Sequence, residues 1–205
     1  MRFFISAGEP SGDIHAAGLI EKIREHAPDT EFVGFGGPKM KEAGCQVLYD
    51  LTKLAVMWFF QALTNYLKFR RLLKKAEYIL STEQFDAVIL VDYPGFNWHI
   101  AHAAKENDIP VYYFMPPQVW AWAQRRVKKM RKLVNTVLAP LPFEYRWFNY
   151  YGCKTVYTGH PFFEEIRSKE PDAEFLEAFY KKYGNGPILT VLPGSRYQEV
   201  KANLD

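Results

Sequence analysis

Two turns of this sequence place side chains that can move protons just after strand-like runs. The run 3–7 is followed by Gly8-Glu9-Pro10-Ser11-Gly12-Asp13, and Asp92 ends a strongly apolar run. In open α/β proteins, ligands bind at the carboxyl ends of the strands. A carboxylate there could act as a general base that takes a proton from an acceptor hydroxyl. The structural alternatives are a helix cap by Ser11 or Asp13, and a cap or loop hydrogen bond made by Asp92.

Several common kinds of site are absent from the sequence pattern. Gly8 and Gly12 are four residues apart, which is not the G-x-G-x-x-G spacing of a dinucleotide site. The histidines show no H-E-x-x-H spacing, and the pair His99 and His102 is only a weak metal signal. No G-x-S-x-G nucleophile turn occurs. The sequence therefore does not indicate a dinucleotide, zinc-protease or serine-nucleophile site.

A segment rich in tryptophan and basic residues follows another strand-like run. Trp120 and Trp122 stand two residues apart after a pair of prolines, a spacing that does not suit one helix face. The two indoles could line an apolar or sugar-binding cleft, or they could pack in the core beneath a loop. The basic run 125–132 could meet phosphate, or it could be a solvated helix face.

The stretch 58–75 is amphipathic, basic, and aromatic at its start. Aromatic side chains in the interface and cations near anionic lipid are typical of a helix that lies on a membrane surface. The alternative is a helix that packs on the sheet and has a basic outer face. The apolar stripe is wide enough for both, with the start on lipid and the remainder on the sheet.

The elements that would position these residues alternate along the whole chain. Short apolar runs, typical of parallel strands buried on both faces, occupy 3–7, 31–36, 86–92, 111–115, 134–139, 154–157 and 187–192. Helical patterns occupy 14–26, 58–82, 97–107 and 174–183. This alternation predicts an α/β fold with a doubly wound parallel sheet.

The composition is that of an ordinary soluble globular protein. The 205 residues are 48% hydrophobic and 24% charged, with a net charge of +3, and aromatic residues reach 17%. Cys45 and Cys153 lack metal-like spacing and fit a reducing compartment. The first residues form too short an apolar run for a signal peptide. No apolar stretch reaches the roughly 18 residues that would indicate a membrane-spanning helix.

Short motifs along the chain resemble those of lipid-A-disaccharide synthases, which are glycosyltransferases of the GT-B type. Each motif is weak alone, but the set occurs in family order across nearly the whole chain. The matching segments are Gly8-Glu9-Pro10-Ser11-Gly12-Asp13, Phe32-Val33-Gly34-Phe35-Gly36-Gly37-Pro38-Lys39-Met40, Leu54-Ala55-Val56-Met57, Asp92-Tyr93-Pro94-Gly95-Phe96-Asn97, Val119-Trp120-Ala121-Trp122, Leu141-Pro142-Phe143-Glu144, Gly159-His160-Pro161 and Leu192-Pro193-Gly194-Ser195-Arg196.

The resemblance implies an architecture and a reaction. Residues 1–166 would form an N-terminal, Rossmann-like, acceptor-binding domain. Residues 167–205 would form a linker and the beginning of a second, nucleotide-binding Rossmann-like domain. The family condenses UDP-2,3-diacylglucosamine with 2,3-diacylglucosamine 1-phosphate: the acceptor 6-hydroxyl attacks the anomeric carbon with inversion, and UDP leaves. No metal or other cofactor is expected, since helix dipoles and basic groups stabilise the leaving diphosphate.

The resemblance also assigns roles to residues of this chain. Asp92 matches the family's general base, and Glu9 is the second catalytic candidate. The expected acceptor contacts are Gly8, Ser11, Gln118, Trp120, Trp122 and Arg125. The expected nucleotide contacts are Gly194, Ser195 and Arg196, and the expected membrane contacts are Trp58, Phe59, Phe60, Leu63, Tyr66 and Leu67.

The chain departs from the family pattern in two residues and in length. Gly95 stands where aspartate is frequent, which leaves Asp92 as the better base, and Trp58 stands where glycine is common. Family members are nearly twice as long, so the chain resembles an N-terminal portion that is inactive or nearly so alone.

The resemblance also implies where the protein works. We expect a cytoplasmic protein, peripheral on the anionic inner face of the inner membrane, with no nucleic-acid partner; the full-length family can form homodimers. Two alternatives remain open. One is a GT-B enzyme for another lipid-linked sugar, and the other is a noncatalytic module that binds membrane or nucleic acid.

Overall fold

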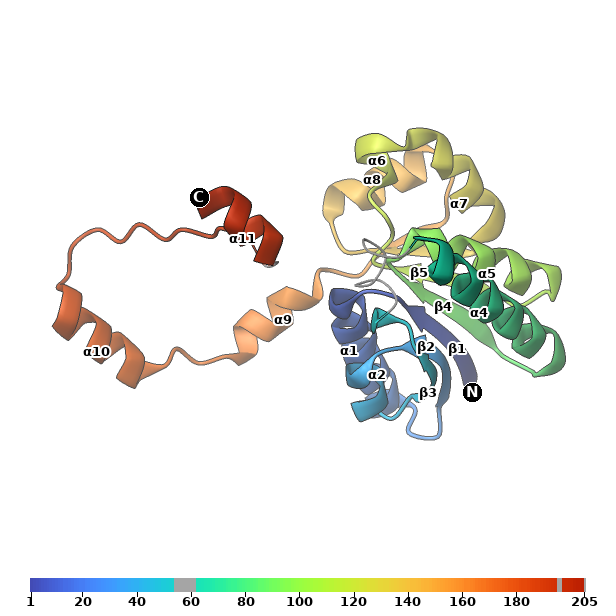
Figure 1. Cartoon of the computed structure of the whole chain (residues 1–205), viewed down its shortest axis with the longest axis horizontal. Coiled ribbons are helices and arrows are strands. Elements are labelled where there is room, and N and C mark those ends of the chain that lie inside the picture. The colour runs from blue at the N-terminus through green and yellow to red at the C-terminus, as the bar shows by residue number, and fades with distance from the viewer. Residues whose placement is uncertain (54–61, 195–196, 205) are drawn as a thin grey trace. The chain divides into compact units, whose positions relative to one another are not determined.

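The computed structural model describes the main chain of residues 1–53, 62–194 and 197–204 (Figure 1). The chain divides into two compact units, Met1–Glu164 and Glu165–Asp205. Within the described residues of the first unit, seven parallel strands form one sheet in the order β3-β2-β1-β4-β5-β6-β7. The strands are β1 (Arg2–Ala7), β2 (Glu31–Gly36), β3 (Gln46–Asp50), β4 (Ala87–Val91), β5 (Val111–Phe114), β6 (Thr136–Ala139) and β7 (Thr155–Tyr157).

Proline defines where many of the helices begin. Its ring holds φ near the helical value, and its missing N–H would have no partner in the first turn. A proline is the first residue of α1 (Pro10–His26), α2 (Pro38–Glu42), α5 (Pro94–Glu106), α8 (Pro142–Tyr150) and α9 (Pro161–Ser168). This is why α1 and α5 begin three to four residues before the predicted 14 and 97. Among its described residues this unit also contains α4 (Ala62–Thr82), α6 (Val119–Trp122), the 3₁₀ turn η1 (Gln124–Arg126) and α7 (Val127–Leu133), while α9 continues past Glu164 into the second unit.

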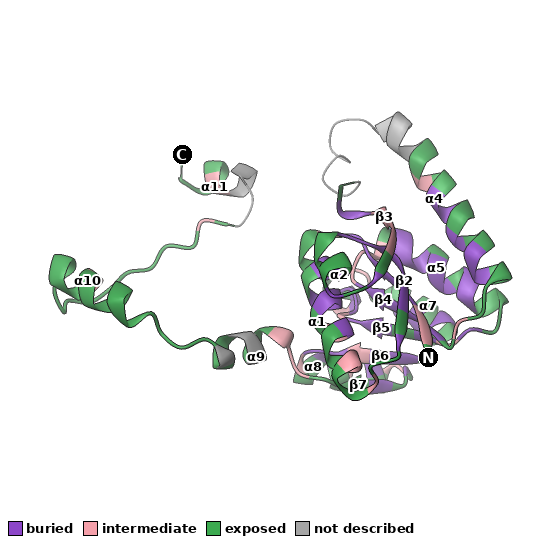
Figure 2. Cartoon of the chain, turned by 90° about the horizontal axis from the view of Figure 1, so that it is seen from below, coloured by how far each residue is buried: buried purple, intermediate pink, exposed green. Residues whose placement is uncertain are grey.

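Helices cover both faces of the sheet, as the sequence alternation predicted. On one face, Val88 and Leu90 of β4 pack with α4, α5 and α7. On the other face, the alternate β4 residues Ile89 and Val91 pack with α1 and α2. Figure 2 shows the buried residues gathered in the strands and on the sides of the helices that face them. The predicted α/β fold with a doubly wound parallel sheet is therefore confirmed.

Two strand predictions are corrected by the structure. Strand β3 was missed, because it is an edge strand whose residues are only half-buried or exposed and lacks a continuous apolar run. The predicted strand 187–192 is not a strand, and Leu189 and Leu192 are 90% and 88% exposed. A strand needs a neighbour to satisfy its main-chain polar groups. No strand occurs among the described residues of the second unit, so the apolar run has no neighbour to pair with and its residues are exposed.

The second unit contains α10 (Ala173–Tyr183) and α11 (Tyr197–Leu204). The side chain of Asp172 accepts a hydrogen bond of 2.9 Å from the Phe175 amide and caps the start of α10. At the other end, Gly184 has φ of 75°, a conformation that favours glycine and ends the helix.

Candidate functional site

The sheet brings the two polar turns together at its carboxyl edge. Strands β1 and β4 are neighbours in the sheet, and chain connections run outward in opposite directions from this pair. Their register pairs Ala7 with Val91, so the next residues, Gly8 and Asp92, lie side by side at the edge. Such a switch point is where open α/β sheets bind ligands. The structure thus places Glu9 and Asp92 at the position that this class of fold uses for chemistry.

The main chain at Asp92 has a conformation that is unusual for residues with side chains. Asp92 has φ of 45°, and Tyr93 has φ of 44°. Residues other than glycine rarely occupy this left-handed region, which costs about 1–3 kcal/mol per residue. The surrounding structure therefore has to hold these two residues in place.

Two donors meet at the carbonyl oxygen of Asp92. The Asn97 side-chain amide donates to this oxygen at 2.7 Å, and the Tyr113 hydroxyl also donates to it at 2.7 Å. Asn97 and Tyr113 come from α5 and β5, and both side chains are fully buried. The peptide that follows Asp92 is therefore held from both sides.

Asn97 also connects β1 to the same peptide. Its side-chain oxygen accepts from the buried Ser6 hydroxyl at 2.7 Å, and its amide group lies 3.2 Å from the Val91 carbonyl oxygen. Asn97 ends one of the segments that resemble family motifs, but the sequence does not predict its role. The signal that could have found it is a lone amide among apolar neighbours in the first turn of a helix. Because buried polar groups need partners, such a residue must bond to something specific.

Gly8 is required by the close approach of the Tyr93 ring. A Cβ atom added at Gly8 would lie 2.0 Å from Cδ1 of Tyr93. No side chain fits in that space without moving the aromatic ring. The glycine that begins the first turn is therefore part of the packing that supports the strained segment after β4.

Burial changes the acidity of Asp92. Removal from water raises the pKa of its carboxyl group, the negative charge of Glu9 raises it further, and the Tyr93 amide opposes the change, with a result of about 6. A carboxylate with this pKa is a stronger base than an ordinary aspartate and is still largely ionised at neutral pH. The arrangement suits proton transfer from a hydroxyl.

The polar residues that follow β1 have different roles, because some are available to the site and Asp13 stabilises the fold. Glu9 is the N-cap residue of α1 and makes no side-chain capping bond, while Ser11 is exposed in the first turn. Asp13 is 2% exposed and accepts hydrogen bonds of 2.8, 2.9 and 3.0 Å from the amides of Gly37, Lys39 and Met40. The interpretation of Ser11 or Asp13 as the cap of α1 is wrong. Asp13 instead caps α2, because α1 begins before it.

The two tryptophans after β5 lie in the short helix α6 and have different environments. The Trp120 indole donates to the Glu144 carboxylate at 2.9 Å, and its ring packs edge-on against Phe143. Trp122 is 63% exposed, and the Arg126 guanidinium lies 4.9 Å from its ring centre. Trp120 thus joins α6 to α8, whereas Trp122 presents its ring to solvent.

Gln118, the N-cap residue of α6, and Arg125, in η1, are both exposed. Glu144 is 2% exposed, and burial raises the pKa of its carboxyl group, which the Trp120 indole partly offsets.

Several predicted site residues lie elsewhere or outside the described residues. Gly194 belongs to the second unit and has φ of 133°, while Ser195 and Arg196 are outside the described residues. Trp58, Phe59 and Phe60 are also outside them, and the side chains of Leu63 and Tyr66 are not described. Leu67 is 57% exposed on α4. Among the described helices, none is both long and apolar enough to cross a bilayer.

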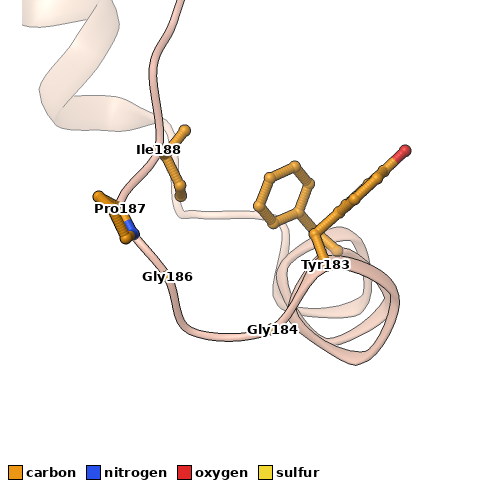
Figure 3. Close-up of a pocket in the computed structure, with 6 residues that line it drawn as sticks. Tyr183, Gly184, Gly186, Pro187 and Ile188 are labelled. Atoms are coloured by element: carbon orange, nitrogen blue, oxygen red, sulfur yellow. The ribbon is translucent and has the colours of Figure 1, made fainter.

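A shallow hollow in the second unit is not a convincing site for chemistry. It has a volume of about 290 Å³ and is lined by Phe179, Tyr183, Gly184, Gly186, Pro187 and Ile188. Figure 3 shows the Tyr183 hydroxyl directed away from the labelled residues. Tyr183 carries the only ionisable side chain among these six. The raised pKa of Asp92 at the β1–β4 edge makes that edge the better candidate.

Comparison with known proteins shows the family to which this sequence is related. A sequence model described as lipid-A-disaccharide synthetase matches residues 3–205. A lipid-A-disaccharide synthase of Nitrosococcus oceani is 38% identical over 200 residues, which are 96% of this chain and 51% of the relative. A second one, of Trichlorobacter lovleyi, is 36% identical over 199 residues, 97% of this chain and 52% of the relative. The chain spans about half the length of the curated relatives it matches.

Solved structures resemble this chain in fold at low sequence identity. MurG of Acinetobacter baumannii superposes with a TM-score of 0.53 at 13% identity, over 84% of this chain and 47% of that chain. A UDP-GlcNAc 2-epimerase of Neisseria meningitidis, bound to UDP-GlcNAc, superposes with a TM-score of 0.59 at 13% identity. The superposition covers 89% of this chain and 53% of that chain. At such identities the likeness concerns the fold alone.

Proposed function

Because the chain belongs to the lipid-A-disaccharide synthase family, we propose that it supplies the acceptor-side part of a glycosyltransferase of lipid A synthesis. The donor is UDP-2,3-diacylglucosamine, and the acceptor is 2,3-diacylglucosamine 1-phosphate. The observation that carries this proposal is Asp92, a half-buried carboxylate of raised pKa at the sheet's switch point, beside the turn that holds Glu9.

The proposed reaction gives Asp92 one task. A bond forms between the acceptor O6 and the donor anomeric carbon, while the bond from that carbon to the diphosphate breaks. The O6 proton passes to the Asp92 carboxylate. The raised pKa supports this role because the carboxylate can accept a proton at neutral pH without being permanently protonated. Glu9 keeps the site negative, which favours transfer of a proton into it.

The acceptor is proposed to contact the rim around Asp92. Gly8 follows β1, and Ser11 lies in the first turn of α1. Gln118 is the N-cap residue of α6, Trp122 ends α6, and Arg125 lies in η1. The exposed ring of Trp122 suits a sugar or acyl face, and exposed guanidinium groups suit the 1-phosphate. Trp120 contributes by holding α6 in place, since its indole N–H is already bonded to Glu144.

The nucleotide is proposed to bind chiefly to the half of the enzyme that completes the length of the relatives. Within this chain, Gly194, Ser195 and Arg196 would form one edge of that site, and residues 167–205 would begin the nucleotide-binding domain. The 205-residue chain would then be inactive or nearly so alone. Homodimers would form, if at all, in the full-length protein.

Acceptor profiling of a full-length synthase that carries this chain tests the proposed substrate class. With UDP-2,3-diacylglucosamine as donor, we expect turnover with 2,3-diacylglucosamine 1-phosphate and release of UDP. Preference for an undecaprenyl-linked acceptor would instead indicate a different lipid-linked sugar transferase. Absence of sugar transfer from a folded full-length protein would favour a noncatalytic binding module.

The pH dependence of kcat/KM should show an ascending limb governed by Asp92. Since the base works only when ionised and its pKa is about 6, the rate should fall about tenfold per pH unit below that value. Glu9→Gln removes a charge that raises this pKa, so the limb should move to lower pH. Glu21→Gln, on the same helix but exposed, is the matched control and should leave the limb in place. An ascending limb at the same pH in Glu9→Gln and in the parent enzyme would contradict the influence of the Glu9 charge on the pKa of Asp92.

We further propose that one face of the first unit lies on the inner face of the inner membrane. Helices α4 and α7 both pack beside α5 on the same side of the sheet. Their exposed cations are Lys68, Arg70, Arg71, Lys74, Lys75, Lys128, Lys129, Arg131 and Lys132. Such a surface suits anionic headgroups, and the proposed lipid contacts 58–67 lie at the start of α4 or just before it.

Vesicle sedimentation tests the membrane proposal. The chain should sediment with vesicles rich in phosphatidylglycerol and less with pure phosphatidylcholine. The pair Arg71→Glu and Lys75→Glu should weaken binding, whereas Lys41→Glu, on α2 across the sheet, should not. Equal binding to both kinds of vesicle, or salt-dependent RNA binding without vesicle binding, would contradict the proposal.

A further inference from the structure

The hydroxyl of Tyr113 has a contact that the proposed proton transfer does not use directly. Tyr113 lies on β5, is fully buried, and donates at 2.7 Å to the main-chain carbonyl oxygen of Asp92. Its ring packs edge-on against Trp98, with ring centres 5.6 Å apart. The ring is therefore fixed, and the hydroxyl is directed at one atom of the neighbouring strand's end.

That atom belongs to the peptide that joins two residues of left-handed conformation. Asp92 and Tyr93 both have positive φ, and neither is glycine. A peptide held in this conformation tends to relax unless its groups are bonded in place. The Asp92 carbonyl receives a second hydrogen bond from Asn97, also at 2.7 Å, so two donors oppose rotation of the peptide.

The protonation of Tyr113 favours this role over the whole working range. Burial, and next to it the Asp92 charge, raise the pKa of Tyr113 well above the ordinary value. The hydroxyl therefore keeps its proton and remains a donor. Its oxygen reaches the Asp92 carbonyl and not the carboxylate, so it can orient the base without competing for the substrate proton.

We propose that Tyr113 is a positioning residue of the proposed transfer, which orients the Asp92 carboxylate by fixing the Asp92–Tyr93 peptide together with Asn97. This inference rests on the proposed role of Asp92 as general base. The carboxylate leaves the main chain at Cα of Asp92, and the peptide plane attached to that Cα is held by the two hydrogen bonds to the Asp92 carbonyl oxygen. A misplacement of the reacting groups by about 1 Å can cost up to about 10²-fold in rate.

The test is a double-mutant cycle in the full-length synthase that carries this chain. Tyr113→Phe removes one hydroxyl and keeps the ring, so kcat should fall about tenfold while KM for both substrates changes little. In an Asp92→Asn background the same change should have no further effect on kcat, because the group it orients is gone. Tyr112→Phe, one residue earlier and 37% exposed, is the matched control and should leave kcat unchanged.

The outcomes separate the inference from the function on which it rests. Unchanged kcat for Tyr113→Phe, beside an impaired Asp92→Asn, would overturn the positioning role alone. If Tyr113→Phe lowered kcat by the same factor in the parent enzyme and in the Asp92→Asn background, its effect would be a general structural one. That result would also overturn the positioning role. Full turnover of Asp92→Asn would overturn the base assignment and the positioning role together. Thermal unfolding of Tyr113→Phe and Tyr112→Phe shows whether any rate change reflects lost folding.

Discussion

Asp92→Asn should reduce kcat of the full-length synthase by about 10²–10⁴-fold, the range associated with loss of a positioned general base. Asparagine keeps the shape of the side chain and can accept a hydrogen bond from the Tyr93 amide. It cannot take the proton of the acceptor hydroxyl. Single-turnover measurement with saturating donor and acceptor isolates the chemical step from product release. Turnover within about threefold of the parent enzyme, well short of the expected loss, would show that Asp92 is not the base.

The same substitution should not weaken the fold. Burial and Glu9 raise the pKa of Asp92 to about 6 in the folded chain, above that of an unfolded aspartate. The unfolded state therefore releases the proton more readily, and this carboxyl makes the fold less stable as pH rises from about 4 to 6. Asp92→Asn removes that cost and should stabilise the chain at pH 7 by about 1–3 kcal/mol. A more stable but inactive variant excludes unfolding as the cause.

Asp108→Asn is the matched control for Asp92→Asn. Asp108 also has a left-handed backbone, with φ of 56°, and lies in the exposed turn between α5 and β5. Asparagine is well tolerated in this conformation. The control should change neither kcat nor the unfolding midpoint, and an equal loss in both variants would point to a general effect of the substitution.

Asn97→Ala should lower the free energy of unfolding of the chain by about 2–4 kcal/mol. The buried Ser6 hydroxyl loses its acceptor, and the Asp92 carbonyl loses one of its two donors. The side chain is fully buried, so the cavity left behind adds to the cost. Urea unfolding followed by tryptophan fluorescence measures the change.

Asn107→Ala gives the matched control for Asn97→Ala on the same helix. Asn107 is the C-cap residue of α5, is exposed, and donates to the Ala103 carbonyl at 2.8 Å. Because water can replace that bond, we expect a loss of less than about 1 kcal/mol. Similar losses in the two variants would show that the buried network contributes nothing beyond an ordinary helix-end hydrogen bond.

Much of the fold could be predicted from local patterns. The β4 run is apolar at every position because both sheet faces are covered, and that pattern is visible without coordinates. Asp92 and the turn after β1 were found for the same reason, since polar residues after such runs lie at the ligand edge. The edge strand β3 and the run 187–192 were misjudged because strand formation depends on a neighbour, which a local pattern does not contain.

The roles of individual polar side chains depended on contacts between distant segments. Asp13 and the α2 amides are at least 24 positions apart, Trp120 and Glu144 are also 24 apart, and Ser6 and Asn97 are 91 apart. Sequence alone could place these residues in turns and helices but could not choose their partners. A hydrogen bond depends on distances of a few tenths of an ångström.

The sequence by itself determined the alternation of strands and helices, the family, and which carboxylates reach the edge of the sheet. Only the tertiary structure decided that Asp92 sits on a strained peptide held by Asn97 and Tyr113, and that burial raises its pKa. The physical reason is that apolar periodicity is a property of neighbouring residues along the chain. Burial, strain and acidity are properties of what the folded chain packs around one residue.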